Sequence, residues 1–204
     1  MKREFSPAYL ALSLVFGCVI FRLLSSEFPS FIPNISPLMA VAFVGAMYLP
    51  RRWGWLVGPA TLLLTDIAFT RLNAQAGMAM FSSWTLISLV VYSVAGAVGI
   101  FLARNKSLVK VISGSLTLSG LFYVVANTFA WAGGAATGAT SGYAMTFPGW
   151  VQANTTGLAG WEPTWHFLRN GMAGDLFFAF VLLLALDRAL VFGRTSLKTA
   201  PSVA

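Results

Sequence analysis

Residues 29–52 read PSFIPNISPLMAVAFVGAMYLPRR, and this stretch decides how the whole chain is interpreted. Three prolines, Pro29, Pro33 and Pro37, precede an apolar run, Leu38–Leu49, that stops at a Pro-Arg-Arg sequence. A membrane-spanning helix needs about 20 apolar residues, so this run is short for a span. We therefore expect the helix to begin inside the proline-rich elbow or to cross a thinned region of the membrane.

The rest of the chain is equally apolar. Of its 204 residues, 57% are hydrophobic and 9% are charged, whereas soluble domains carry about 25% charged residues. So few charged groups cannot cover a water-facing surface, which predicts an integral membrane protein embedded in a lipid bilayer. The net charge of +7 fits cytoplasmic loops, so we expect no nucleic-acid partner. Cys18 stands alone, which excludes an internal disulfide.

Continuous apolar runs, rather than alternating ones, favour helices over strands. We expect an all-α protein with six transmembrane helices, the first of them uncleaved. The expected spans are Tyr9–Leu24, Leu38–Leu49, Gly54–Thr70, Met80–Ala103, Leu108–Trp131 and His166–Phe192. Residues 1–193 then form one membrane domain, and residues 194–204 form a polar cytoplasmic tail.

Basic residues give the expected orientation. Six spans place all the following residues on one side: Lys2, Arg3, Arg51, Arg52, Arg104, Lys106, Lys110, Arg194 and Lys198. The opposite loops hold Glu27, Arg71 and Glu162 and little other charge. Because cytoplasmic loops carry the excess of Lys and Arg, we expect a multi-pass inner-membrane protein with both termini in the cytoplasm.

Three connections are expected to face outward, at residues 25–37, 71–79 and 132–165. The third is the longest, rich in Gly, Ala and Thr, yet it contains aromatic residues that include Tyr143, Trp150 and Trp161. Long ordered loops are typically lids or binding loops, and aromatic faces suit a large, flat, partly apolar ligand. The alternative is that these aromatic residues only anchor the loop at the membrane surface.

Polar residues inside spans are costly and are by default candidates for function. Asp66 lies in the third span, and the sixth begins with His166, Arg169 and Asn170. His166 and Asn170 are four residues apart, so they share a helix face, where they could line a ligand pocket. The alternative is structural: Arg22 or Arg169 would pair with Asp66 or Asp175 and fix the helix packing.

Enzyme signatures are missing from the sequence. The single histidine excludes a His-x-x-x-His metal pair, and neither a phosphate-binding Walker loop nor a Gly-x-Ser-x-Gly motif occurs. Asp66 and Asp175 could in principle act as an aspartyl pair, but neither stands in a recognisable motif. We therefore expect a transport or binding protein rather than an enzyme.

Two stretches resemble the substrate-binding S-components of energy-coupling factor vitamin transporters. They are RLLSSEFPSFIPNISPLMAVAFVGAMYLPRRWGWLVGPATLLLTDIAF (residues 22–69) and FLRNGMAGDLFFAFVLLLAL (residues 167–186). They are similar in several features to the branch that includes the solitary cobalamin transporters called BtuM. These features are an arginine, a proline elbow, and the patterns Asn-x-Ser-Pro, Gly-Ala and Arg-Asn-x-x-x-Gly-Asp. The likeness covers roughly half of the chain. It implies an S-component-like bundle with an outward-facing ligand pocket.

The resemblance implies uptake of cobalamin, a vitamin B12-type corrinoid, from the outer side of the membrane. Pro33 and Asn34 would belong to a fixed wall of the pocket, because prolines hold a loop in one shape. The expected ligand-binding residues are Pro33, Asn34, Asp66, Met80, Tyr143, Trp150, Trp161, His166, Arg169 and Asn170. Met80 and His166 are the candidate axial ligands of the corrinoid cobalt; no catalytic cofactor is expected.

The resemblance also implies partner proteins. S-components dock on a transmembrane coupling protein through small residues of the first helix, here Ala11, Ser13 and Gly17. Two ATPases would supply the energy, since this chain has no ATP site of its own. The rival functions are transport of another vitamin or small organic molecule, an intramembrane enzyme, and a structural or assembly protein.

Overall fold

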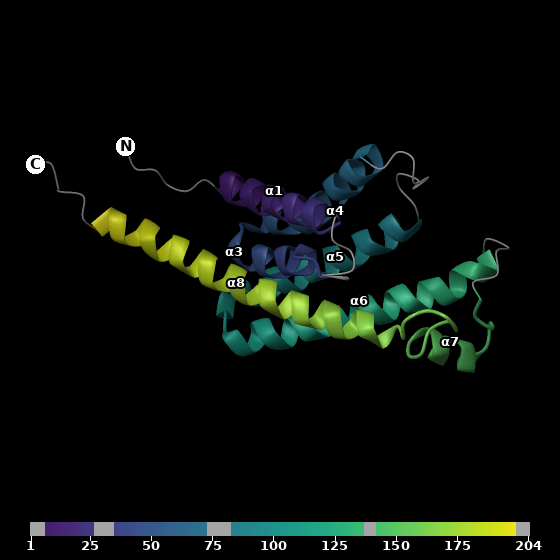
Figure 1. Ribbon diagram of the computed structural model, residues 1–204. Coiled ribbons are helices and arrows are strands. Elements are labelled where there is room, and N and C mark those ends of the chain that lie inside the picture. Colours follow the sequence, from purple (N-terminus) through teal and green to yellow (C-terminus); the bar gives the residue numbers. More distant parts are fainter. Residues whose placement is uncertain (1–6, 27–34, 73–82, 137–141, 199–204) are drawn as a thin grey trace, which may run out of the picture.

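The computed structural model describes residues 7–26, 35–72, 83–136 and 142–198, and the regular structure in these ranges is helical (Figure 1). The elements are α1 (Pro7–Ser26), α2 (Leu38–Ala40), η1 (Val41–Gly45), α3 (Ala46–Tyr48), α4 (Arg51–Leu72), α5 (Ser83–Leu102), η3 (Ala103–Asn105), α6 (Leu108–Ala136), α7 (Phe147–Ala153) and α8 (Trp165–Lys198). The all-α prediction is therefore confirmed for these residues.

Four of the described helices, α1, α5, α6 and α8, are long and apolar enough to cross a membrane. Helix α4 has 22 residues but carries several charged side chains, and the apolar segment Leu38–Tyr48 is shorter than a span. The chain is thus a membrane-embedded, multi-pass protein. The count of six spans stays a prediction, although every expected span corresponds to a helix in the structure.

The short apolar segment forms a central helix, which we define as Leu38–Tyr48 (α2, η1 and α3). Leu38 to Met47 are all buried, and five longer helices surround them: α1, α4, α5, α6 and α8. Its middle part, η1, is a wider π-helical turn. A helix that is apolar on every side is typical of one enclosed by protein, and this explains why its length need not match the membrane.

Glycines let the neighbouring helices approach this central helix closely. A Cβ added at Gly99 of α5 would lie 2.9 Å from the Ala46 Cβ, and one at Gly58 of α4 would lie 2.7 Å from the Ala42 Cβ. On α6, Gly114 faces the Phe43 ring. Small residues allow close packing of helix backbones in membranes, where apolar burial alone gives little drive for association.

The outer surface of the bundle is apolar. Exposed large hydrophobic side chains follow α1, α5, α6 and α8, including Leu12, Phe16, Ile20, Leu86, Val90, Phe101, Ile112, Val124, Phe177 and Val181. Such a surface would be unfavourable in water, and it fits contact with lipid chains.

One end of the bundle collects basic side chains. Helix α4 begins there with exposed Arg51 and Arg52, and the short η3 turn brings Arg104 to the same end. Helix α1 begins and α8 ends on this side (Figure 1). At this end the Tyr48 hydroxyl donates to Asp187 of α8 at 2.6 Å. The grouping agrees with the predicted topology, while the orientation in the membrane stays a prediction.

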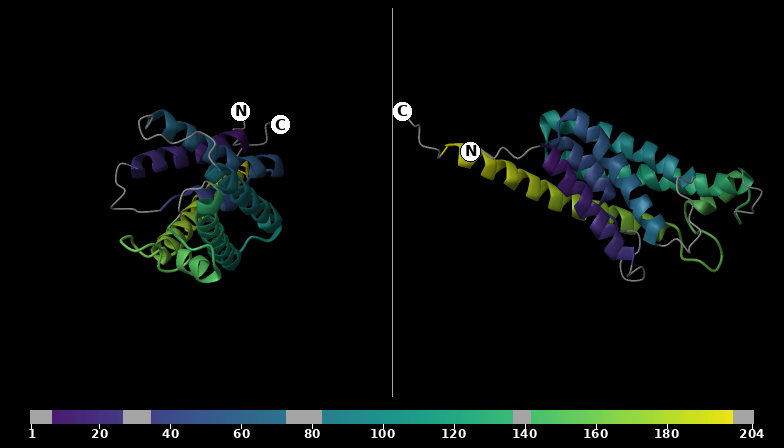
Figure 2. Two further views of the ribbon diagram at one scale, coloured as in Figure 1. Left: turned by 90° about the vertical axis from the view of Figure 1, so that its right-hand side faces the viewer. Right: turned by 90° about the horizontal axis from the view of Figure 1, so that it is seen from above.

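At the opposite end, which we call the outer end in keeping with that prediction, the helices separate into two groups. Figures 1 and 2 show the outer end of α4 on one side of the molecule and α7, with the ends of α6 and α8 beside it, on the other. The central helix lies between the two groups, in contact with both. The predicted ligand-binding residues that the structure describes lie in this outer half.

Candidate functional site: the polar outer half and its aromatic cap

Polar side chains join neighbouring helices in the outer half. Arg22 of α1 donates from Nη1 to the Thr65 hydroxyl of α4 at 2.6 Å, and Thr65 in turn donates to carbonyls of its own helix. The next residue, Asp66, accepts from the Thr85 hydroxyl of α5 at 2.9 Å. Consecutive residues of α4 therefore bind α1 and α5, because side chains 100° apart on a helix point to different neighbours.

A third polar contact joins the remaining pair of long helices. The carboxyl group of Asp175 on α8 is hydrogen-bonded to the Ser119 hydroxyl of α6. Between the two groups of helices, Tyr92 of α5 is buried and stacks on Phe122 of α6 with ring centroids 5.7 Å apart. Tyr92 thus links α5 to α6 between the two groups of helices.

The expected ion pairs do not form. Within the described ranges, neither Arg22 nor Arg169 lies within ion-pair distance of Asp66 or Asp175. Arg22 instead donates to a threonine, and Arg169 lies exposed at the start of α8, more than one helical turn away from Asp175. The predicted pairing of these arginines with Asp66 or Asp175 is therefore wrong. The rotation of each helix about its axis, and not charge alone, decides which side chains meet.

Residues 142–165 form a compact structure, which we call the aromatic cap. Its helix α7 is attached to α6: the Trp150 Nε1 donates to Thr128 at 2.8 Å, and the Tyr123 hydroxyl donates to the Asn154 carbonyl at 2.8 Å. The Trp131 Nε1 donates to the Ala144 carbonyl at 2.9 Å. Residues 142–165 of the long connection are therefore an ordered element fixed to the outer end of α6.

The local sequence explains the fold of the cap. Thr146 caps α7 by accepting from the Gly149 amide, and Pro148 stands in the first turn, where its missing N–H costs nothing. A Cβ at Gly149 would lie against the Ala144 carbonyl, so only glycine fits there. Burial raises the pKa of Tyr143 above its ordinary value, which keeps its hydroxyl neutral.

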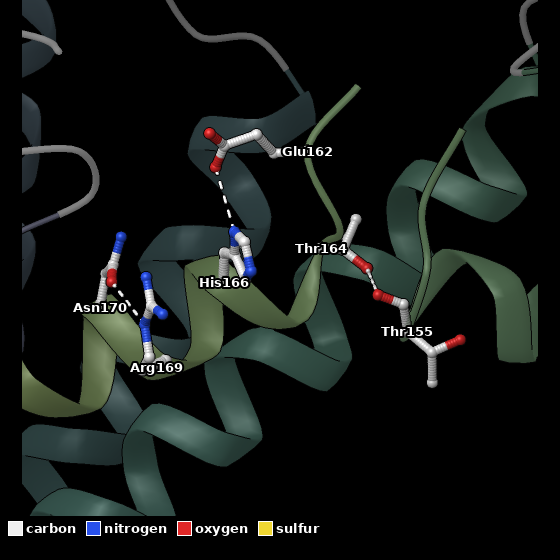
Figure 3. Close-up of polar contacts among 6 residues, drawn as sticks. All are labelled: Thr155, Glu162, Thr164, His166, Arg169 and Asn170. Atoms are coloured by element: carbon white, nitrogen blue, oxygen red, sulfur yellow. Dashed lines mark hydrogen bonds and ion pairs between the residues drawn. The ribbon is translucent and has the colours of Figure 1, made fainter. Parts of the chain in front are cut away.

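The first turns of α8 hold a second polar group, drawn in Figure 3. The His166 Nδ1 lies 3.2 Å from a carboxylate oxygen of Glu162, four residues earlier. Arg169 donates from Nε to the Asn170 amide oxygen at 3.2 Å, and its guanidinium group lies over the Trp165 ring. The predicted cluster of His166, Arg169 and Asn170 is therefore brought together, at the junction of α8 and the cap.

Comparison with known proteins adds a family to this geometry. A family model described as "Family of unknown function (DUF6580)" matches residues 3–193. The chain belongs to the DUF6580 family. Neither the curated proteins nor the solved structures include a match to it.

The predicted ligand-binding residues of this DUF6580 chain differ in their exposure. Trp161 is 78% exposed on the cap, and Asp66 is partly buried inside the bundle. Trp150 is only partly exposed, because its indole N–H bonds to α6 and its ring stacks on Phe147. Pro33, Asn34 and Met80 lie outside the described residues.

The predicted docking residues of α1 also differ in position. Ser13 and Gly17 lie on the exposed face, and nothing stands within 4 Å of a Cβ added at Gly17. Ala11 is buried in the core and cannot meet a partner directly. A partner helix on this DUF6580 chain would therefore meet Ser13 and Gly17.

Sequence reasoning missed several polar residues of the outer half. Tyr92 and Thr85 are not predicted as site residues, because a lone tyrosine or threonine in a span gives no distinctive pattern. Ser115 and Ser119 could have been found, since they are four residues apart and share one face of the fifth expected span. That face meets Asp175 in this DUF6580 structure.

Proposed function

We propose that this chain is a membrane uptake protein that binds a cobalamin-type corrinoid from the outer side and carries it across the membrane in the manner of an S-component. The observation that carries the proposal is the aromatic cap. Its polar atoms are largely used to hold the cap together and to fix it to α6, while the rings of Phe147 and Trp161 stay exposed. Exposed, positioned aromatic faces suit a large ligand with apolar surfaces.

Polar side chains of the outer half support the same proposal. A corrinoid carries amide groups around its ring, and these need hydrogen-bond partners when the ligand leaves water. Asp66, Asn170 and Arg169 supply acceptors and donors in the outer half. A binding site that combines apolar walls with a few placed polar groups is the usual composition for organic ligands.

The energy for transport must come from outside the binding site. The sequence holds no phosphate-binding loop, so ATP hydrolysis would belong to partner subunits docked on Ser13 and Gly17 of α1. The same fold could carry another vitamin. An intramembrane aspartyl enzyme is less well supported, because Asp66 and Asp175 bond to different partners, Thr85 and Ser119, rather than to each other.

The first test is a visible absorption spectrum. The purified protein is incubated with cobalamin, desalted and scanned, with riboflavin and thiamine tested in parallel. We expect corrinoid bands at equimolar stoichiometry. A colourless but monodisperse protein would remove cobalamin as the ligand, and retention of another vitamin would redirect the proposal to that ligand.

A pair of tryptophan variants then tests the cap. Trp161→Ala removes an exposed ring of the cap, and Trp55→Ala removes a partly exposed ring near the opposite end of the bundle. We expect weaker corrinoid retention only in Trp161→Ala, since neither ring belongs to the packed core. Equal retention in both variants would exclude Trp161 from the ligand contact.

The cobalt ligand is tested separately. If His166 binds the cobalt, His166→Ala changes the spectrum of the bound corrinoid, because the axial ligand sets its absorption. Met80→Ala is the matched variant for the other candidate. The His166 Nε2 could bind the cobalt while Nδ1 keeps its contact with Glu162, because metal-binding histidines usually hold a carboxylate on their other ring nitrogen. An unchanged spectrum in both variants would exclude both residues as axial ligands.

A further inference from the structure

Asp175 lies deep within the membrane domain. It stands about 15 Å along α8 from Trp165, at a rise of about 1.5 Å per residue. The same face of α8 carries Ala179 and Leu186, which are both buried. The preceding residue, Gly174, packs against Ile35 at the entrance to the central helix. The carboxyl group therefore points into the bundle rather than into lipid.

Among the described residues, Asp175 has no ion-pair partner. In the described ranges, the only carboxylate within 4.0 Å of a basic group is that of Glu162. The titratable groups in the middle parts of the helices around Asp175 are Arg22 and Cys18 of α1, Asp66 of α4, Tyr92 of α5 and Tyr123 of α6, and the buried part of the central helix contributes none. The ends of these helices add Tyr9, Arg51, Arg52, Arg71 and Lys110. Arg22 is directed to Thr65, and on α8 itself Asp187 bonds to Tyr48 at the basic end.

An unpaired carboxylate is unfavourable in such a place. Moving a charge from water into a medium of low dielectric costs much more than one hydrogen bond returns, so an isolated buried carboxyl group takes up a proton. Intramembrane carboxyl groups of this kind are expensive and occur where they have a function.

The hydrogen bonds of Ser119 also indicate that Asp175 carries a proton. Its hydroxyl carries one hydrogen but lies within bonding distance of two acceptors, the Ser115 carbonyl at 2.9 Å and the Asp175 carboxyl oxygen. If Ser119 donates to the carbonyl, the hydrogen between Ser119 and Asp175 has to come from Asp175. A protonated Asp175 satisfies every contact in this chain of three groups.

Ser115 adds a further polar atom one turn along α6. Its hydroxyl oxygen is buried, and it has no hydrogen-bond partner in the described part of the chain. Ser115, Ser119 and Asp175 thus form a small polar group at the α6–α8 contact.

We propose that Asp175, with Ser119 as its hydrogen-bond acceptor, is a proton-binding site inside the membrane domain, and that it holds a proton in this conformation. On release, the O–H bond of Asp175 breaks and the proton passes to water, leaving a carboxylate. The site goes beyond the uptake function and does not depend on the identity of the carried ligand. It gives the chain a group that can bind and release protons within the membrane.

Infrared spectroscopy of the full-length purified protein tests the site directly. A protonated carboxyl group has its own C=O stretching band, separate from that of a carboxylate. At neutral pH we expect this band in the wild type and in Asp66→Asn, and its loss in Asp175→Asn. The band should disappear from the wild type as the pH is raised. Its absence from the wild type at neutral pH, or its persistence in Asp175→Asn, would overturn the proposal.

Ser119→Ala tests the direction of the hydrogen bond. If Asp175 donates to Ser119, the variant loses an acceptor for the neutral acid, and the band at neutral pH weakens. If Ser119 donates to a carboxylate, the band strengthens instead, which would contradict the proposal. Asparagine also mimics the neutral acid, so Asp175→Asn should fold as well as the wild type; a failure to fold would count against a neutral Asp175.

A sodium titration separates a proton site from a cation site. The band should be unchanged when sodium chloride replaces choline chloride at constant pH and ionic strength. Loss of the band with sodium would show that Na⁺ displaces the proton, and the assignment as a proton site would fail.

Discussion

Replacing Gly99 by alanine should separate α5 from the central helix. The added Cβ would lie 2.2 Å from the carbonyl oxygen of Phe43 and 2.9 Å from the Ala46 Cβ. The first contact is about 1 Å shorter than ordinary van der Waals packing. Because the obstructing atom belongs to the backbone of the central helix, no side-chain rotation relieves it, and a whole helix has to shift.

Overpacking of this kind costs about 1–3 kcal/mol. For a chain of this size, 1 kcal/mol corresponds to a change in Tm of about 2–4 °C, so the expected fall is about 2–12 °C. The measurement is the temperature at which the detergent-solubilised protein loses its monodisperse size-exclusion peak.

Gly17→Ala is the matched control, because nothing lies within 4 Å of a Cβ at that position on α1. Alanine is the better helix former, so Gly17→Ala should leave Tm unchanged or slightly higher. If the two variants have the same Tm, or if Gly99→Ala is neutral, the close contact between α5 and the central helix is refuted.

Further predictions concern the polar contacts. Thr65→Val removes the hydrogen-bond acceptor for Arg22 and should lower the free energy of unfolding by about 1.5–3 kcal/mol, the usual range for a hydrogen bond to a charged group. Thr61→Val removes only a bond to its own helix, and it should lower Tm less in the same assay. Gly160→Ala places a side chain at φ +87° with open space around it. Backbone strain of about 1–2 kcal/mol should therefore make the cap more sensitive to protease. Gly171→Ala, which also adds a side chain in open space, should leave the protease sensitivity unchanged. Glu162→Gln should change stability by less than about 1 kcal/mol, because its side chain is 76% exposed and such pairs are weak; a larger fall in Tm at low salt would contradict this.

Much of the fold follows from apolar run length and charge. Each expected span matches a helix, and differences at the ends have local causes. Helix α6 continues to Ala136, past the predicted end at Trp131, since Ala and Gly there do not stop it. Helix α7 was expected as part of a loop, although Thr146 and Pro148 are an ordinary helix start.

The surroundings of each helix could not be predicted in the same way. The run Leu38–Leu49 is equally apolar whether lipid or protein covers it, so its burial on all sides depends on glycines of other helices, such as Gly58 and Gly99. The partner of Arg22 likewise depends on how α1 and α4 are rotated. The cluster at the start of α8 was predictable, because His166 and Asn170 are neighbours along one helix.

The enclosed central helix has a consequence for how the protein is made. Its 11 residues, Leu38–Tyr48, extend about 16 Å, too little to settle in a bilayer by themselves. Two of the helices that enclose it, α6 and α8, are translated much later. A nascent chain that ends before α8 leaves part of this segment uncovered. Helix α8, which is translated long after this segment, therefore completes the core that the earlier helices begin, and chains truncated before α8 should be substrates for membrane quality control.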